Sequence, residues 1–252
     1  MTQRSFHWQD LPAALGLLSR LPISVDPARA TARSAEATWA YPIAGAILGA
    51  CTGTAALAAQ FIGLPPVAQA LAALTASVIL TGAMHEDGLA DSADGLWGGW
   101  TKDRRLEIMK DSRTGAYGVI AIALSLLWRA ALLTTLFEAT PQMALPICIG
   151  LGALSRAGLP LMMGQMPQAR QGGLSASVGR PKALPAIVGP MIGIAIALPL
   201  IGLFPCLAAA IILGLWAAIA MRKIGGQTGD ILGASQQLTE IAALIALTAS
   251  LL

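Results

Sequence analysis

The chain alternates long apolar stretches with short polar ones. Residues 37–84 and 183–221 contain no Asp, Glu, Lys or Arg. A membrane-crossing helix needs about 20 mostly apolar residues, so each stretch is long enough for two spans. Pro65-Pro66 divides the first stretch and Pro205 divides the second. The pattern predicts seven spans, of which the last is short: Trp39–Leu64, Pro66–Met84, Tyr117–Phe137, Met143–Gly164, Leu184–Phe204, Pro205–Met221 and Ile241–Leu252.

Composition favours a membrane protein over a soluble one. Hydrophobic residues make up 56% of the chain and charged residues only 12%, with a mean hydropathy of +0.69. A typical soluble domain is about a quarter charged. We therefore expect an all-α fold, a polytopic integral membrane helical bundle with about six to seven transmembrane helices. Residues 1–252 would form a single membrane-embedded domain, in which residues 1–37 are a cytoplasmic or interfacial segment with a short amphipathic helix near Leu11–Leu18.

Positive charges fall on one side of this map. The lysines and arginines outside the spans lie before the first span, in residues 85–116, in residues 165–183 and directly after the sixth span. The turns near residues 64, 140 and 204 have none. The positive-inside rule makes the charged side cytoplasmic and places the N-terminus there. The net charge of +3 then reflects topology, so the expected partner is the lipid bilayer and no nucleic acid.

Two arginines lie inside predicted spans, where a charge is costly and usually functional. Arg129 has two options, pairing with Glu138 or extending to the membrane interface. Arg156, which follows Ser155, is placed to reach a polar cavity and bind a phosphate.

Four carboxylates lie within nine residues after the second span: Glu86, Asp87, Asp91 and Asp94. The spacing i, i+4, i+7 puts the three aspartates on one helix face, where they repel each other unless a cation is bound between them. Oxygen ligands favour a hard cation, Mg²⁺ or Mn²⁺; the alternative is a solvated acidic loop. Glu86 points about 100° away from Asp87 and is the least secure member. His85 is a candidate base or donor to a metal ligand, or an ordinary interfacial histidine.

A second polar segment, residues 102–118, adds both acids and cations. Glu107 and Asp111 are spaced i, i+4, so they are candidates to complete a metal site. Arginine forks and lysine match phosphate oxygens. The alternative is a cytoplasmic loop with helical ion pairs. The candidate phosphate-binding residues here are Arg105, Lys110 and Arg113.

A third segment, residues 225–233, is rich in glycine and follows the sixth span. Such loops expose backbone N–H groups and often lead into a helix N-terminus that binds anions. Asp230 is either a metal ligand or the N-cap of a helix. The candidate phosphate-binding residues are Gly225, Gly226, Gln227 and Thr228.

Metal and phosphate sites together at a membrane surface predict phosphoryl chemistry. An alcohol would attack a pyrophosphate-activated substrate, and an Asp or His would accept the alcohol proton. An ion-coupled transporter that uses intramembrane carboxylates is the main alternative. Against it, the acids lie at one face and no inverted repeat is evident in the sequence.

Three motifs carry a family resemblance. In chain order they read His85-x-Asp87-Gly-Leu-Ala-Asp91-x-x-Asp94-Gly95, then Arg105-Leu-Glu-Ile-Met-Lys-Asp111-Ser-Arg113-x-Gly115, then Gly225-Gly-Gln-Thr-Gly-Asp230-x-Leu-Gly233-Ala. With these spacings the chain resembles the cobalamin synthases, the adenosylcobinamide-GDP ribazoletransferases. The resemblance extends from about residue 17 to the end of the chain.

The resemblance implies the last assembly step of the nucleotide loop of vitamin B12, in a single catalytic domain. The 3′-hydroxyl of α-ribazole, or of its 5′-phosphate, attacks the cobinamide-side phosphate of adenosylcobinamide-GDP, GMP leaves, and adenosylcobalamin or its 5′-phosphate forms. It also implies Mg²⁺, the cytoplasmic face of a prokaryotic inner membrane and a wide cavity for the corrin ring. Candidate protein partners are a second copy of the chain and other corrinoid-pathway enzymes.

The resemblance also assigns the acidic residues. Asp87, Asp91 and Asp94 match the first motif of the family, Asp111 the second and Asp230 the third, whereas the position of Glu86 is left open by the motif. Which aspartate binds metal and which accepts a proton does not transfer.

Overall fold

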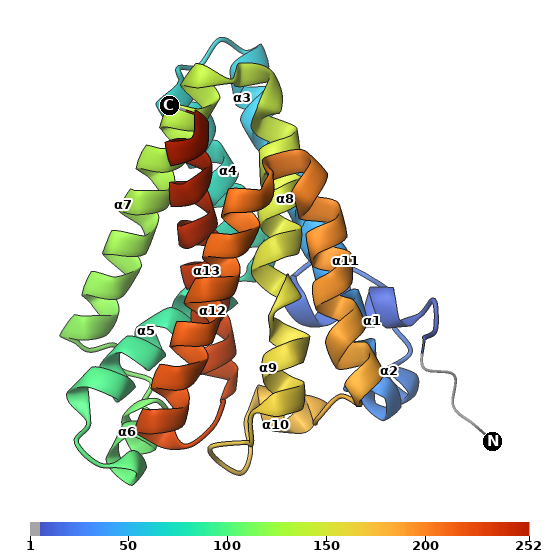
Figure 1. Cartoon of the computed structure of the whole chain (residues 1–252), viewed down its shortest axis with the longest axis vertical. Coiled ribbons are helices and arrows are strands. Elements are labelled where there is room, and N and C mark those ends of the chain that lie inside the picture. Colours follow the sequence, from blue (N-terminus) through green and yellow to red (C-terminus); the bar gives the residue numbers. More distant parts are fainter. Residues whose placement is uncertain (1–5, 252) are drawn as a thin grey trace.

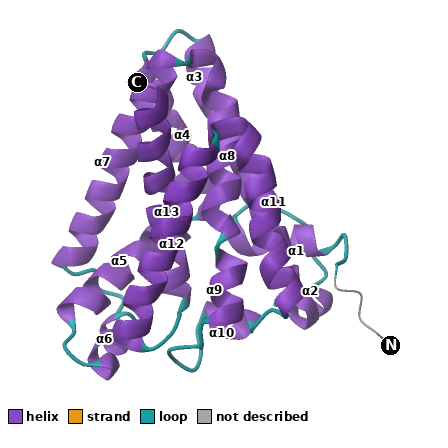
Figure 2. Ribbon diagram, in the orientation of Figure 1, coloured by secondary structure: helices purple, strands orange, loops and turns teal. Residues whose placement is uncertain are grey.

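The structure is a computed structural model and describes residues 6–251. These residues form helices and connecting turns with no β-strand (Figures 1 and 2). The α-helices are α1 (Asp10–Leu18), α2 (Pro27–Arg33), α3 (Tyr41–Phe61), α4 (Pro66–Thr81), α5 (Met84–Gly98), α6 (Lys102–Ile108), α7 (Ala116–Ala139), α8 (Ala144–Ala157), α9 (Leu159–Gln165), α10 (Leu174–Val178), α11 (Ala183–Ile201), α12 (Leu203–Ile224) and α13 (Gly229–Leu251).

The membrane-bundle prediction is confirmed. In the described part of the chain, six helices are long and apolar enough to cross a membrane, or seven if α4 and α5 are counted as one bent span. The axes of α4 and α5 differ by 85°. The chain turns here through Gly82 and Ala83, which both have positive φ. The protein is therefore a multi-pass membrane protein in which the acidic helix α5 turns away from the span that precedes it.

The polar connections gather at one end of the bundle, as the charge pattern predicts. Figure 1 shows a narrow end with the C-terminus and the α3–α4 and α7–α8 turns, and a wide end with α1, α2, α6 and α10. The loop between α12 and α13 lies at the wide end as well. The segments 85–116, 165–183 and 222–228 therefore lie on the same side of the bundle, although they are far apart in the sequence.

The last span differs from the prediction. It begins at Gly229 rather than Ile241, so only residues 225–228 of the predicted Gly-rich loop are outside a helix. Its first half carries Gln236, Gln237 and Glu240, which lower the hydropathy of the segment. These side chains are hydrogen-bonded to other helices inside the bundle. Hydropathy missed half of the span because its polar side chains face other helices rather than lipid.

The predicted span 143–164 is also divided. Helix α8 ends at Ala157, and α9 begins at Leu159 with Pro160 in its first turn. Proline lacks the amide hydrogen that would continue the hydrogen-bond ladder of α8, and it is well tolerated in the first turn of a new helix.

Glycines allow the helices that carry the acidic residues to approach closely. A Cβ on Gly88 of α5 would lie 2.9 Å from the Asp230 carbonyl oxygen and 3.2 Å from the Gly233 Cα of α13. Real Cβ atoms do not come that close to backbone, so only glycine fits. This contact places the first and third sequence motifs side by side. Gly45 and Gly49 of α3 lie in the same way against the backbone of α8.

The N-terminal segment folds against the wide end of the bundle. The predicted amphipathic helix is confirmed as α1, whose Ala14, Leu15 and Leu18 are buried in the core. The buried Asp10 carboxylate accepts hydrogen bonds of 2.8 Å from Arg33 of α2 and from the Trp39 indole. One carboxylate thus ties α1 to α2 and to the start of the first span.

Candidate functional site

A cavity of about 220 Å³ lies at the meeting of α1, α5, α9 and the start of α13. Its walls include Asp87, Asp230 and Arg170, together with the nearly buried His85. Most other lining residues are apolar, among them Leu17, Tyr41, Met163, Leu174 and Val178. Acidic side chains from the first and third motifs therefore share one cavity.

The three aspartates of α5 occupy one helix face, as predicted, but differ in exposure. Asp87 is exposed, Asp91 is half-buried, and Asp94 is buried. The negative charges of Asp87, Asp230 and Asp94 all act on the Asp91 carboxylate, and the positive charge of Arg170 acts against them. The described residues around Asp91 thus carry more negative charge than positive.

Asp94 has a structural task that the sequence did not indicate. Its carboxylate accepts hydrogen bonds from the backbone amides of Gly115 at 2.7 Å and Gly118 at 3.0 Å. These amides belong to the first turn of α7, where backbone donors lack helical partners and the helix dipole favours a negative charge. Asp94 therefore caps α7 from a neighbouring helix. Its predicted roles in metal binding and catalysis stay predictions.

Asp230 lies in the first turn of α13. Asp230 is not the N-cap of α13. Thr228 caps the helix instead, because its hydroxyl accepts a hydrogen bond from the Ile231 amide at 3.2 Å. The Asp230 carboxylate instead accepts from the Thr228 hydroxyl at 3.2 Å and forms an ion pair with Arg170 at 3.0 Å. Asp230 is thus free of a capping role and faces the cavity.

The 225–228 loop is braced internally. Gly225 donates to carbonyls at the end of α12, and Gln227 donates from its backbone to Pro167. Gly226 packs against the same Pro167 carbonyl. Because these groups have partners within the chain, the loop holds α12, α13 and the 167–169 segment together. Phosphate binding by Gly225, Gly226, Gln227 and Thr228 stays a prediction.

The cations predicted in the second motif point elsewhere. Arg105 donates to the Gly99 and Lys223 carbonyls at 2.9 Å, which links α5, α6 and α12. Arg113 pairs with Asp111 at 2.7 Å, and Lys110 is exposed nearby. Asp111 lies beyond the end of α6, so the predicted helical i, i+4 relation to Glu107 does not form. The Arg113 guanidinium hydrogen bonds hold the pKa of Asp111 at about 2. None of these side chains lines the 220 Å³ cavity.

The carboxylates of the cavity can be compared with what Mg²⁺ needs. Within residues 6–251, no three His, Cys, Asp or Glu side chains come together as a complete metal cage. Mg²⁺ usually keeps several waters and is held by one or two carboxylates together with substrate phosphates. Asp87 and Asp230 line the cavity, and the charges of both act on the nearby Asp91 carboxylate. These two cavity carboxylates are the kind of donor that Mg²⁺ takes together with a phosphate-bearing substrate, and Mg²⁺ binding stays a prediction.

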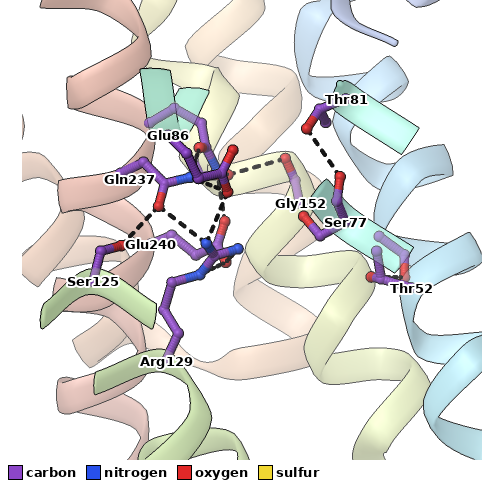
Figure 3. Close-up of polar contacts among 12 residues, drawn as sticks. Thr52, Ser77, Thr81, Glu86, Ser125, Arg129, Gly152, Gln237 and Glu240 are labelled. Carbon is purple, nitrogen blue, oxygen red and sulfur yellow. Dashed lines mark hydrogen bonds and ion pairs between the residues drawn. The ribbon is translucent and has the colours of Figure 1, made fainter. Parts of the chain in front are cut away.

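Glu86, about 100° around α5 from Asp87, has a different environment. Glu86 points into the bundle, where Figure 3 shows it with Arg129 of α7 and Glu240 of α13. The Arg129 guanidinium is 3.1 Å from Glu86 and 3.0 Å from Glu240, and also donates to Gln237. Arg129 is 1% exposed. The predicted options for Arg129, pairing with Glu138 or extending to the interface, are wrong, because its partners come from helices distant in sequence.

Arg156 also lies inside the bundle. It donates to the Gly152 carbonyl and the Ser155 hydroxyl, and it lines a separate cavity of about 40 Å³ with Arg129 and Glu240. The polar cavity predicted for it is present. That volume holds a few water molecules. Arg156 does not line the larger cavity, so phosphate binding by Arg156 stays a prediction.

A family model described as cobalamin-5-phosphate synthase matches residues 10–248. The chain belongs to this family. A protein of Brucella ovis named adenosylcobinamide-GDP ribazoletransferase is 41% identical over 96% of this chain and 97% of its own. A Bradyrhizobium diazoefficiens protein of the same name is 40% identical over 94% of this chain and 92% of its own. No solved structure matches the chain.

Sequence reasoning about this member of the cobalamin-5-phosphate synthase family missed two residues. Arg170 lines the cavity beside Asp230, but in the sequence it is one of several cations in a polar loop. Glu240 pairs with Arg129 from within a span that hydropathy placed too late. The charge of Glu240 inside an apolar stretch was the one available signal for it.

Proposed function

We propose that this protein completes the nucleotide loop of cobalamin. It transfers adenosylcobinamide phosphate from adenosylcobinamide-GDP to the 3′-hydroxyl of α-ribazole or its 5′-phosphate, and releases GMP. The observation that carries the proposal is that Asp87 and Asp230 line the same cavity. They belong to two acidic motifs that are about 140 residues apart in the sequence, and both lie within the segment that matches the family model. The family match and the names of the relatives support the same activity.

The reaction forms a bond between the ribose oxygen and the cobinamide-side phosphorus. It breaks the bond between that phosphorus and the bridging oxygen, which leaves with GMP. The hydroxyl proton passes to a carboxylate. The exposed Asp87 and the half-buried Asp91 are the candidate bases, and His85 is a further candidate. Bound Mg²⁺, held by Asp87, Asp91 and Asp230, would neutralise charge on the diphosphate.

Room for the large substrates is available beside the acidic cavity. A second cavity of about 460 Å³ shares Leu17, Tyr41, Leu174 and Val178 with it. Its lining is mainly small and apolar, with Ala14 and Gly16 from α1. We place the apolar bodies of the substrates here, with their phosphates toward Asp87 and Asp230.

We further propose that the wide end faces the cytoplasm across the inner membrane. The positively charged connections at this end support that orientation through the positive-inside rule. The nucleotide substrate would then reach the cavity without crossing the bilayer. An ion-coupled transporter is not favoured, because the family and the named relatives are transferases.

The test is reconstitution with defined substrates. Purified protein in vesicles would receive adenosylcobinamide-GDP, α-ribazole and Mg²⁺, and GMP and cobalamin would be measured. We expect equimolar amounts of both products. Absence of product with every divalent cation tried, from either α-ribazole or its 5′-phosphate, refutes the proposal. Uptake of an ion or corrinoid into sealed vesicles without a chemical product would instead favour transport.

A further inference from the structure

Arg170 lines the 220 Å³ cavity beside Asp230. Of the described residues that line this cavity, it alone carries a permanent positive charge. One terminal nitrogen, Nη2, lies 3.0 Å from an Asp230 carboxylate oxygen. The other, Nη1, is buried and has no hydrogen-bond partner among the described residues. A buried N–H donor without a partner is costly, so a ligand that accepts from it gains affinity.

The backbone around Arg170 is fixed rather than loose. The Ala169 amide donates to the Gln227 carbonyl at 2.9 Å, and the Gln227 amide donates to Pro167 at 2.9 Å. The Ser175 hydroxyl, a few residues further on, donates to the Gln227 side chain at 2.6 Å. The segment 167–175 is therefore held against the start of α13. This bracing keeps the arginine at the cavity wall.

The other predicted phosphate-binding arginines are committed elsewhere. Arg105 donates to two backbone carbonyls, Arg113 pairs with Asp111 in an exposed loop, and Arg156 lies in the separate small cavity. A diphosphate that enters beside Asp87 and Asp230 would therefore meet Arg170. The fork of N–H groups on a guanidinium matches phosphate oxygens, and it is more selective for them than an ammonium group.

We propose that Arg170 binds the diphosphate of the nucleotide-activated substrate, on the guanylyl side that leaves as GMP. In the structure its Nη2 is paired with Asp230, and its Nη1 is buried without a partner, so a small rotation of the guanidinium would be needed to present this donor to a phosphate oxygen. When the bridging P–O bond breaks, the leaving phosphate gains negative charge, and the Arg170 hydrogen bond strengthens with it. This inference rests on the proposed function for the identity of the diphosphate.

The direct test is binding of GDP, used as a probe of the diphosphate end. Isothermal titration would compare wild-type protein, Arg170→Gln and the control Arg222→Gln. Arg222 is an exposed arginine of α12 that does not line the cavity. We expect roughly 10- to 100-fold weaker GDP binding for Arg170→Gln, the loss typical of a hydrogen bond to a charged group, and no change for the control. Unchanged GDP affinity in folded Arg170→Gln overturns the proposal.

Steady-state kinetics separates substrate binding from a structural role. For Arg170→Gln we expect a higher KM for adenosylcobinamide-GDP, a lower kcat and an unchanged KM for α-ribazole. Equal effects on both KM values would indicate a disturbed cavity and contradict the assignment. If Arg170→Gln does not fold, Arg170→Lys keeps the charge but loses the fork, and it should still weaken GDP binding several-fold. Wild-type GDP affinity in Arg170→Lys would refute recognition by the fork.

The two proposals fail in distinguishable ways. If wild-type protein binds GDP through Arg170 but makes no cobalamin, the proposed function fails and the diphosphate site stands. If wild-type protein makes cobalamin and Arg170→Gln matches it in GDP binding and in kcat, the role of Arg170 fails and the proposed function stands.

Discussion

The two faces of α5 carry carboxylates in opposite electrostatic settings. On the outer face, Asp87 and Asp91 stand near Asp230 with an excess of negative charge. On the inner face, one residue before Asp87, Glu86 is neutralised by Arg129 and hydrogen-bonded to Gln237. An acidic side chain that is paired with an arginine inside the bundle stabilises the fold, whereas an acidic cluster with an excess of negative charge at a cavity needs a cation or a substrate. On the same helix, therefore, Glu86 serves stability and the next residue, Asp87, serves chemistry.

Metal removal should have the largest effect, and only on the outer face. Chelation with EDTA should lower GMP release by about 1000-fold or more, because a bound cation supplies several kcal/mol of charge stabilisation. Mg²⁺ should restore activity. The unfolding midpoint should fall only slightly, by the binding energy of the lost ion. Full activity in EDTA would show that the outer carboxylates work without a cation.

Removal of Arg129 should have the largest effect on stability. Arg129→Met leaves Glu86 and Glu240 buried without their counter-charge, so we expect about 3–5 kcal/mol lower unfolding free energy. Thermal unfolding in detergent measures it. Glu138→Gln is the matched control, since Glu138 is an exposed carboxylate on the same helix, and it should change stability little. Equal stability of the Met variant and wild type would contradict a structural role for the inner face.

Asp94 lies on the outer face of α5, yet its carboxylate is hydrogen-bonded to backbone amides, as the stabilising carboxylates are paired. Asp94→Ala should destabilise by about 1–2 kcal/mol through loss of the α7 cap. Asp94→Asn keeps an acceptor oxygen and should cost less. Thermal unfolding of both variants, with the exposed Asp103→Asn as control, separates capping from charge. If Asp94→Ala is as stable as the wild-type protein, Asp94 does not stabilise the fold by capping α7.

Replacement of Asp10 should have the smallest effect on stability, and this effect should depend on pH. Burial raises the pKa of the Asp10 carboxyl, but hydrogen bonds from Arg33 and Trp39 outweigh it, so the pKa lies below its ordinary value. A lowered native pKa contributes stability above the unfolded pKa of about 3.9, and this is lost as pH falls through the native pKa. Asp10→Asn should therefore cost roughly 1 kcal/mol at pH 7 and progressively less toward pH 3. A difference that does not depend on pH would refute the charge explanation.

The sequence predicted the fold class well where physics is local. Apolar length located most spans, the positive-inside pattern grouped the loops at one end, and the i, i+4, i+7 spacing correctly placed Asp87, Asp91 and Asp94 on one helix. The prediction failed where a span contains polar side chains whose hydrogen-bond partners come from neighbouring helices. The start of α13 and the partners of Arg129 depend on tertiary contacts, and hydropathy along one chain contains no information on them.

The candidate site was only partly predictable for the same reason. The first and third motifs were expected to act together, and the Gly88–Gly233 contact places them side by side. The second motif was expected to supply phosphate donors, but Arg105 and Arg113 have partners outside the cavity. Arg170 was not singled out, because nothing in a polar loop marks which cation packs beside Asp230.

The position of a carboxylate around α5 separates chemistry from stability, and one paired measurement decides whether it does. GMP release and thermal unfolding would be measured for Asp91→Asn and Glu86→Gln side by side. We predict that Asp91→Asn loses about 100-fold or more in kcat with little change in stability. Glu86→Gln should lose about 1–3 kcal/mol of stability and keep kcat within a few-fold in the folded protein. Folded Asp91→Asn with wild-type kcat, or a stable Glu86→Gln without activity, would contradict the account.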